Sequence, residues 1–359
     1  MKKSLFFITL TTCIALTQSA NACTGITLKS KDGATIVART MDWSGSENNS
    51  MYVIVPRGHN MQSLLPDGTM NGLNYTSLYG YSGLAVEQPE FVIDGTNEAG
   101  LSAGLFYFPN YGKYQSYNEA SKDISLADFQ VVSWILSRFS TIDQVKAAIN
   151  DIRIINVDPS ASTVHYRITE PSGRQVVLEI VDGRPNFYEN EVGVLTNAPG
   201  FQWQMTNLNN YVNLHPGGAG PTAFGPITLR SFGSGSGFLG LPGDFTPPSR
   251  FVRAAFLKTY SLEQPTAYDT TQQAFHILNN FDVPLGVQFA VGRAPNNMPS
   301  ATQWTISTDL KDMVIYYHTM YNRTIRSIDM KNIDFTTVPF QYHSLDDAKR
   351  QTIIPVKID

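Results

Sequence analysis

Short runs of β-branched and aromatic residues, separated by turn residues, dominate the hydrophobic pattern of this chain. Two such runs near the N-terminus flank Asp32-Gly33. An Asp-Gly pair in this position is typical of a β-hairpin. Because a hairpin returns its second strand to the point where the first began, we expect Cys23, Arg39 and Asp42 to meet at one end of a sheet.

The remaining pattern predicts an α+β protein. Strands are expected at residues 25–29, 35–39, 52–55, 91–93, 101–108, 164–169, 175–181, 193–196, 303–307, 313–318 and 324–328. Helical spacing occurs at residues 126–139, 142–149, 202–214, 250–260 and 270–280. Strands followed by helices and again by strands favour two sheets covered by helices. The Gly/Pro-rich residues 215–248 are expected to form a long irregular loop that shapes the site.

The first 22 residues have the three parts of a secretory signal peptide. Met1-Lys2-Lys3 is basic, an apolar run follows as far as Leu16, and Ala20-Asn21-Ala22 matches an A-x-A cleavage site. The apolar run is too short to span a bilayer, and no later segment reaches the required length of about 18 residues. The pattern predicts an exported protein, periplasmic or secreted, with one domain over residues 23–359.

Removal of that segment would make Cys23 the first residue of the mature chain. Cys13 would be lost with the segment, so Cys23 would be the single remaining cysteine. An α-amine titrates near about 7.7–8.0 and a thiol near about 8.5, so the amine can accept the proton of the thiol. This combination is typical of an N-terminal nucleophile that attacks an amide carbonyl.

Two other interpretations of Cys23 stay open at this point. One is an acylated cysteine that tethers a lipid-anchored binding protein. Ala20-Asn21-Ala22 fits it poorly, because Leu and small residues are favoured there. The other is a structural cysteine with no chemical role.

Composition excludes several classes of function. The chain has 359 residues, 42% of them hydrophobic and 11% aromatic, which excludes intrinsic disorder. With 26 Lys and Arg against 30 Asp and Glu, it has no positive surplus for a nucleic-acid partner. The six histidines lack ligand-like spacing, and Gly235–Gly240 matches GxGxxG without opening a helix. We therefore expect neither a metal nor a cofactor.

A set of ordered motifs supports a more specific hypothesis. The motifs include CTG at residues 23–25, ARTMDW at 38–43, DGTNEAGL at 94–101, GVLTNAP at 193–199 and SRFVRAAF at 249–256. Together they resemble the choloylglycine hydrolase family, which comprises penicillin V acylases and conjugated bile acid hydrolases. The resemblance extends from residue 23 to about residue 320. It implies a four-layer αββα N-terminal-nucleophile hydrolase fold, with two antiparallel sheets between helical layers, and a possible homotetramer.

The resemblance also assigns roles to individual residues. It identifies Cys23 with the nucleophile, Arg39 and Asp42 with the pair beside it, Asn197 with the oxyanion-hole amide and Arg250 with a second active-site arginine. Asp42 can orient the α-amine, and a nearby cation favours the thiolate. An Asn N–H can hold the oxyanion, and the second arginine can hold the carboxylate or a substrate group. Taken singly, each residue type is also common at turns, caps or the surface.

One motif departs from the bile salt hydrolase pattern. The resemblance implies a Gly-Leu-Asn-Phe-Pro motif in many of those enzymes at the place of residues 104–109. Here Tyr107 takes the position of the asparagine, with one extra residue nearby, as in penicillin V acylase-like members. Its backbone N–H is expected to complete the oxyanion hole, and Phe106 is the alternative by a one-residue shift. Trp43, Phe106 and Phe108 are predicted to line an apolar acyl pocket, although strand aromatics more often belong to the core.

The sequence thus predicts an exported hydrolase of linear amides, acting on a small-molecule acyl amide through Cys23. Penicillin V is the first substrate class that the resemblance suggests, and conjugated bile acids follow closely. N-acyl-homoserine lactones and other acyl amides are further alternatives, and a lipid-anchored binding protein is the alternative of another class.

Overall fold

Two large antiparallel sheets form the body of the protein. The computed structural model describes residues 23–43, 47–157, 162–289 and 301–358, so the predicted signal peptide lies outside the described residues. The six-stranded first sheet contains, in spatial order, β14 (Val194–Leu195), β1 (Gly25–Lys29), β2 (Thr35–Trp43), β17 (Ala301–Asp309), β18 (Val314–Thr319) and β19 (Arg326–Asp329). The eight-stranded second sheet contains β13 (Arg184–Glu189), β12 (Gln175–Val181), β11 (Val164–Thr169), β8 (Ser102–Tyr107), β7 (Val92–Asn97), β6 (Tyr81–Ala85), β3 (Met51–Val55) and β20 (Gln341–Ser344).

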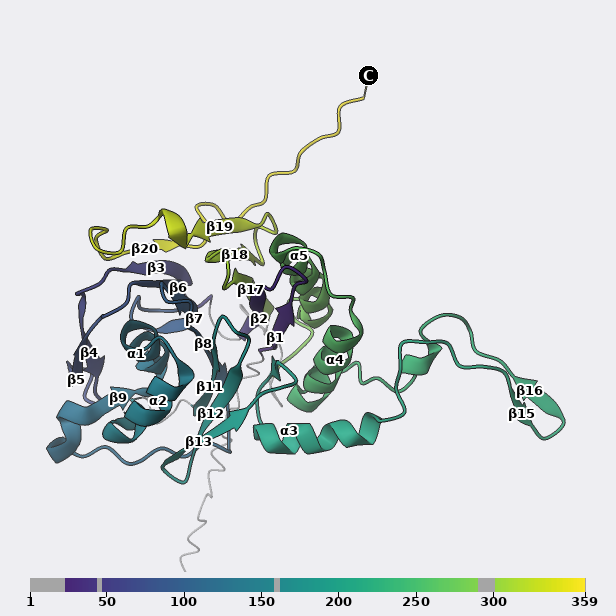
Figure 1. Ribbon diagram of the computed structural model, residues 1–359, viewed down its shortest axis with the longest axis horizontal. Helices are drawn as coiled ribbons and strands as arrows, with labels where there is room; N and C mark the ends of the chain where they lie inside the picture. The colour runs from purple at the N-terminus through teal and green to yellow at the C-terminus, as the bar shows by residue number, and fades with distance from the viewer. Residues whose placement is uncertain (1–22, 44–46, 158–161, 290–300, 359) are drawn as a thin grey trace, which may run out of the picture.

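Helices cover the outer side of each sheet (Figure 1). The second sheet carries α1 (Val131–Arg138) and α2 (Ile142–Ala148), whereas α3 (Phe201–Asn207), α4 (Pro247–Tyr260) and α5 (Ala267–Leu278) lie on the side of the first. This four-layer αββα arrangement confirms the predicted fold class. In the described ranges, no helix has the length and apolar character needed to cross a bilayer.

Smaller elements complete the chain. Short strands form three further pairs: β4 (Asn60–Leu64) with β5 (Met70–Thr76), β9 (Ser125–Ala127) with β10 (Arg153–Ile155), and β15 (Thr222–Phe224) with β16 (Ile227–Leu229). Short 3-10 helices occupy Glu119–Ile124, Asp128–Gln130, Ile149–Asp151, Leu208–Tyr211, Ser236–Phe238, Asn279–Phe281 and Met330–Asn332.

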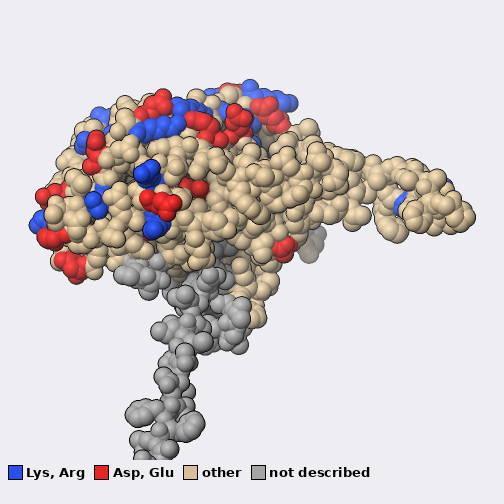
Figure 2. All heavy atoms as spheres, turned by 90° about the horizontal axis from the view of Figure 1, so that it is seen from below, with Lys and Arg blue, Asp and Glu red and all other residues tan. Residues whose placement is uncertain are grey.

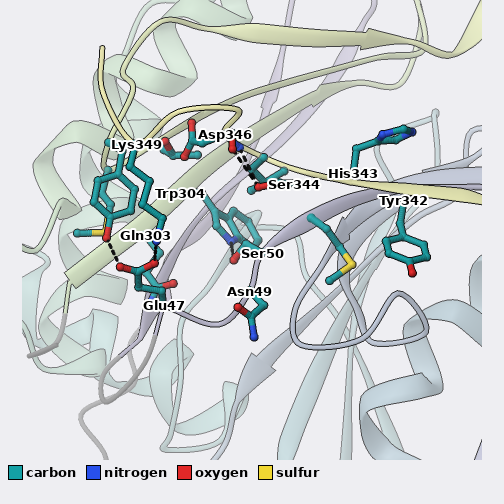
Figure 3. A pocket seen from close by; sticks show the side chains of 15 residues that line it. Glu47, Asn49, Ser50, Gln303, Trp304, Tyr342, His343, Ser344, Asp346 and Lys349 are labelled. Carbon is teal, nitrogen blue, oxygen red and sulfur yellow. Dashed lines mark hydrogen bonds and ion pairs between the residues drawn. The ribbon is translucent and has the colours of Figure 1, made fainter. Parts of the chain in front are cut away.

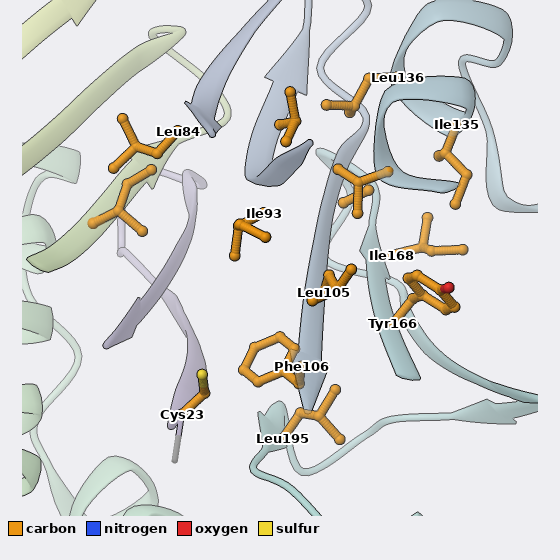
Figure 4. Close-up of a cluster of buried hydrophobic side chains, with 14 of the residues drawn as sticks. Cys23, Leu84, Ile93, Leu105, Phe106, Ile135, Leu136, Tyr166, Ile168 and Leu195 are labelled. Atoms are coloured by element: carbon orange, nitrogen blue, oxygen red, sulfur yellow. The ribbon is translucent and has the colours of Figure 1, made fainter. Parts of the chain in front are cut away.

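The predicted N-terminal hairpin is confirmed. Strands β1 and β2 pair antiparallel with Gly25 opposite Arg39, which brings Cys23 to the C-terminal end of β2. Figure 4 shows Cys23, two residues before β1 begins, on the side of Phe106 of the second sheet. A Cβ atom on Gly25 would lie 2.7 Å from the Phe106 ring. A glycine at this position therefore allows the two sheets to approach each other beside Cys23.

The Gly/Pro-rich excursion differs from its prediction in one respect. It is largely irregular, as expected, but residues 216–243 extend away from the layered body as an arm that carries the β15–β16 hairpin (Figure 1). Its base returns to the body at Phe245, whose carbonyl oxygen accepts a hydrogen bond of 2.9 Å from Arg250 Nε. Most of the arm is exposed, whereas Phe238 packs against Phe256 and Tyr260 of α4.

Candidate active site

Cys23 is held at both of its main-chain groups. Its nitrogen donates to Asn197 Oδ1 at 2.9 Å, and its carbonyl oxygen accepts a hydrogen bond from Arg250 Nη1. Its side chain is buried, with Sγ 3.9 Å from Met41 Sδ. The main chain of Cys23 is therefore held in place, and its thiol lies in the interior between the two sheets.

Asn197 connects this cysteine to the second sheet. It follows β14, and its Nδ2 donates to the Tyr107 carbonyl oxygen at 2.9 Å. Its Oδ1 accepts from Cys23 and also from Arg250 Nη2, the latter at 2.6 Å. An amide nitrogen has two donors, so the second N–H of Asn197 can serve a developing oxyanion.

The strand register distinguishes Tyr107 from Phe106 as a second donor. Phe108 N donates to Thr163 O at 2.8 Å, and N–H groups alternate between the two edges of a strand. The N–H of Tyr107 therefore points to the opposite edge of β8, where its own carbonyl already meets Asn197. The N–H of Phe106 points to β11, which favours Tyr107.

Arg39 crosses the space between the sheets. It is fully buried, and its guanidinium donates to the carbonyl oxygens of Thr40 at 3.1 Å, of Ile93 at 3.4 Å, and of Leu105. The guanidinium carbon lies 4.2 Å from the centre of the Phe106 ring. These contacts fix a positive charge near Cys23.

Opposing influences act on the thiol. Burial raises the pKa of Cys23, the charges of Arg39 and Arg250 lower it, and the Asp42 carboxylate raises it. A hydrogen bond from the Asp42 main chain also lowers the pKa of the thiol. Since burial is the largest of these influences, the thiol requires a base that removes its proton and forms the thiolate.

Asp42 lies beside Cys23, as expected, with its carboxylate bonded to two threonines. Its Oδ1 accepts from Thr302 Oγ1 at 2.5 Å and its Oδ2 from Thr40 Oγ1 at 3.3 Å, whereas the Cys23 nitrogen donates to Asn197. Burial raises the pKa of Asp42 to about 7, against the opposing charge of Arg250. In the full-length chain Asp42 thus acts on the thiol electrostatically and through its main chain, and its role toward a free α-amine stays a prediction.

Arg250 lies in the first turn of α4. Its Nη1 donates to Thr24 Oγ1 at 2.9 Å as well as to Cys23, and its Nη2 reaches Asn197. Burial lowers the pKa of Arg250 to about 10, so it stays cationic at neutral pH. Its hydrogen bonds hold the cysteine main chain and the Asn197 amide, its charge acts on Asp42, and its expected contact with a substrate group stays a prediction.

The three predicted pocket aromatics occupy different environments. Trp43 is half-buried at the end of β2, and its role in an acyl pocket stays a prediction. Phe106 is fully buried against Arg39, and Phe108 stacks on His165 with the ring centres 4.4 Å apart. This burial places both phenylalanines in the core beside the site.

Two residues of the cluster, Met41 and Thr302, were missed by sequence reasoning. Met41 contacts Cys23 Sγ and Arg39 Nη2, the latter at 3.7 Å, and it lies in the ARTMDW motif directly before Asp42. Thr302 lies 260 residues further along the chain and reaches Asp42 through the pairing of β17 with β2. A local pattern could have indicated Met41, but not Thr302.

A separate surface cavity of about 370 Å³ lies where β3, β17 and β20 meet (Figure 3). Its walls include Trp304, whose Nε1 donates to Ser50 Oγ at 3.1 Å, and Tyr321, which bonds Glu47 at 2.7 Å. None of the six predicted catalytic residues lines it. In the part of the chain that the structure describes, no cluster of His, Cys, Asp and Glu side chains is arranged to hold a metal ion.

Similarity to known proteins agrees with this geometry. The family model of linear amide C–N hydrolases, choloylglycine hydrolase family, matches residues 23–346. A bile salt hydrolase/transferase of Clostridium perfringens (strain 13 / Type A) is 33% identical, over 87% of this chain and 94% of the relative. A penicillin V acylase of Pectobacterium atrosepticum is 24% identical, over 89% of this chain and 83% of that protein.

Solved structures share the architecture. A mutant conjugated bile acid hydrolase from Clostridium perfringens superposes with a TM-score of 0.80 and 30% identity, over 93% of this chain and all of the other. Penicillin V acylase from Agrobacterium tumefaciens has a TM-score of 0.73 at 22% identity, over 91% of this chain and 93% of that one, a likeness of fold alone. The two-sheet fold is therefore that of the N-terminal-nucleophile hydrolases. The chain belongs to the choloylglycine hydrolase family and is a linear amide hydrolase.

Proposed function

We propose that this enzyme is exported, that removal of residues 1–22 frees Cys23, and that the Cys23 sulfur attacks the substrate amide. The observation that carries the proposal is the position of the Asn197 side chain. It bonds the Cys23 nitrogen, Arg250 and the Tyr107 carbonyl at once. The prospective base, nucleophile and oxyanion donors therefore belong to one connected cluster.

The charges around the thiol support its ionisation during catalysis. Two cations, Arg39 and Arg250, and one carboxylate, Asp42, act on Cys23. The two cations outweigh the one carboxylate, and this positive surplus lowers the cost of a buried thiolate. In the mature chain the free α-amine of Cys23 would accept the thiol proton.

The chemistry follows in two halves. The sulfur bonds to the amide carbon, the carbonyl electrons move to oxygen, and the oxyanion accepts hydrogen bonds from Asn197 Nδ2 and the Tyr107 N–H. When the carbon–nitrogen bond breaks, the α-ammonium of Cys23 gives its proton to the leaving amine, which leaves a thioester. Water, deprotonated by the same amine, then attacks the thioester and releases the acid and the free thiol.

Two substrate classes have specific support. The 33% identity to a bile salt hydrolase/transferase favours conjugated bile acids, and we place them first. Tyr107 favours penicillin V. By the family resemblance, many bile salt hydrolases have an asparagine at this position, whereas penicillin V acylase-like members do not. The identity to the bile salt hydrolase/transferase thus reverses the order of the two substrate classes that the motif alone suggested.

The decisive experiment compares mature wild-type protein with Cys23→Ser. Amine release is measured from penicillin V and from glycine- and taurine-conjugated bile acids at equal concentration, and thermal unfolding of both proteins verifies their fold. We expect the wild type to cleave one class at least tenfold faster and Cys23→Ser to be inactive. Equal activity of the folded serine variant would overturn the mechanism, and cleavage of neither class would overturn the substrate assignment.

A further inference from the structure

A buried histidine–glutamate pair lies behind the candidate oxyanion hole. His165 on β11 and Glu179 on β12 are both buried, and His165 Nδ1 lies 3.3 Å from Glu179 Oε1. Neither residue contacts Cys23, and neither has a role in the chemistry described above. Buried ionisable groups are costly unless they are paired and hydrogen-bonded, so the further contacts of this pair are informative.

The pair holds both ends of the turn that carries Asn197. His165 Nε2 lies 3.0 Å from the carbonyl oxygen of Thr196, the residue directly before Asn197. Glu179 Oε1 accepts a hydrogen bond of 2.8 Å from the nitrogen of Phe201, where α3 begins. The turn between β14 and α3 is thus tied to the second sheet on either side of the Asn197 amide.

The same imidazole ring also packs on the strand that carries Tyr107. It stacks face to face on Phe108, with ring centres 4.4 Å apart and planes 9° apart. It meets Phe106 edge to face at 6.2 Å and 82°. These phenylalanines are the two chain neighbours of Tyr107, so one ring contacts the residues flanking both proposed oxyanion donors.

Both ring nitrogens of His165 face oxygen acceptors, namely the Glu179 carboxylate and the Thr196 carbonyl. The ring therefore has an oxygen partner at each of its nitrogens, and these two contacts fix it in one orientation.

We propose that His165 and Glu179 are positioning residues that set the separation of Asn197 and the Tyr107 N–H for the oxyanion. The inference rests on the proposed function for the role of those two donors. Neither residue of the pair touches the reacting atoms. Each acts by fixing main chain beside a donor, a requirement of sites that stabilise a transition state by preorganised hydrogen bonds.

Two variants separate this role from general stability. His165→Phe keeps an aromatic ring against Phe108 but removes both ring nitrogens, and Glu179→Gln keeps an acceptor for Phe201. Tyr166→Phe is the matched control, because Tyr166 is the next residue of β11, is equally buried, and donates to Asp128 O at 2.9 Å. Figure 4 shows Tyr166 on the α1 side of the sheet, away from Cys23.

The assay compares amide hydrolysis with alkylation of Cys23 by iodoacetamide. In alkylation the sulfur displaces iodide from carbon, and no oxyanion forms. We expect kcat of His165→Phe and Glu179→Gln to fall at least tenfold with KM changed less than threefold, while their alkylation rates stay within twofold of wild type. Tyr166→Phe should lower the unfolding temperature but keep kcat within twofold. If alkylation and hydrolysis fall in parallel, or if kcat is unchanged, the proposal is wrong.

A second readout does not depend on turnover. Crystal structures of the wild type and Glu179→Gln are compared at the Asn197 Nδ2 to Tyr107 O contact, which is 2.9 Å here. We expect this contact to lengthen or break in the variant, and an unchanged contact would overturn the positioning role. If the wild type cleaves no tested amide, the proposed function fails, and this comparison still decides the positioning role.

Discussion

At the scale of single residues, the site depends on which hydrogen-bonding groups come from side chains and which come from main chain. Asn197 offers a side-chain donor, whereas Tyr107 is proposed to offer its backbone N–H. The two positions should therefore respond differently to truncation. This difference also explains how Tyr107 can stand in place of an asparagine without loss of the chemistry.

We predict that Asn197→Ala lowers kcat by about 10²–10³, because it removes one oxyanion donor. Tyr107→Ala should keep kcat within about tenfold and alter mainly the preference between acyl groups, since the backbone N–H stays in place. Steady-state kinetics on the preferred amide measure both. A larger loss of kcat in Tyr107→Ala than in Asn197→Ala would contradict the assignment of the donors.

The raised pKa of Asp42 predicts a dependence of stability on pH. Burial raises the pKa of Asp42 from its ordinary value of 3.8 to about 7, so the folded state binds more protons between these values. Stability from this group is therefore lost as pH rises from 4 to 7, by up to roughly 4 kcal/mol. Urea unfolding should show that Asp42→Asn gains stability relative to wild type over this range. A constant difference between the two proteins from pH 4 to pH 8 would contradict the raised pKa.

At the scale of elements, the β1–β2 hairpin and its contact with β8 build the site. Phe106 reaches Arg39 because Gly25 leaves room for its ring. The hairpin could be predicted from the sequence, since the Asp-Gly turn is a local signal. The packing of the second sheet on Gly25 could not, because it joins residues that are distant in the chain.

Gly25→Ala should lower the free energy of unfolding by about 1–3 kcal/mol, because its Cβ would overlap the Phe106 ring. Gly220→Ala is the control, as nothing lies within 4 Å of a Cβ at that position. Thermal or chemical unfolding measures both variants. Equal stability of the two would show that the sheets tolerate the extra methyl group beside Cys23.

Local patterns predicted the strands rich in β-branched residues but missed several others. The expected strands 164–169 and 175–181 match β11 and β12. Strand β6 was missed because its sequence YSGLA has weak strand propensity and is buried by its neighbours. The helix expected from residue 126 begins at Val131, since Ser125–Ala127 pairs with β10 instead. In both cases, pairing with strands that are distant in the sequence determined the secondary structure.

The candidate site was predictable to a similar extent. Its principal residues lie in ordered motifs, which the family resemblance identified, and the structure brings Cys23, Arg39, Asn197 and Arg250 together. The hydrogen-bond partners were not predictable in detail. Asp42 bonds Thr302 across two paired strands, and no feature of the sequence near either residue indicates the contact.

At the scale of the whole molecule, charge is distributed unevenly. Figure 2 shows acidic and basic side chains gathered over the body, whereas the arm has almost none. Among residues 192–243 of the sequence, Arg230 is the only one of the types Asp, Glu, Lys and Arg. Phe224 and Phe232 are exposed on the arm. A surface of this kind favours contact with another protein surface, and we propose a second copy of this chain in a homotetramer.

The wild type is therefore expected to have the mass of a tetramer in light scattering after size-exclusion chromatography. Phe224→Ser combined with Phe232→Ser should reduce that mass, because it removes exposed aromatic area from the arm. Ser and Asn substitutions at Tyr342, which is exposed on β20, provide the control. A wild type with the mass of a single chain would contradict the proposal.

The central claim is that Cys23 is both the first residue of the mature enzyme and its nucleophile. Intact-mass spectrometry of the exported protein, quenched in acid during turnover of its preferred amide, tests both parts. We predict a chain that begins at Cys23, with an acyl adduct on that residue that hydroxylamine removes. An active chain that begins elsewhere, an adduct on another residue, or a diacylglyceryl group on Cys23 would contradict the account.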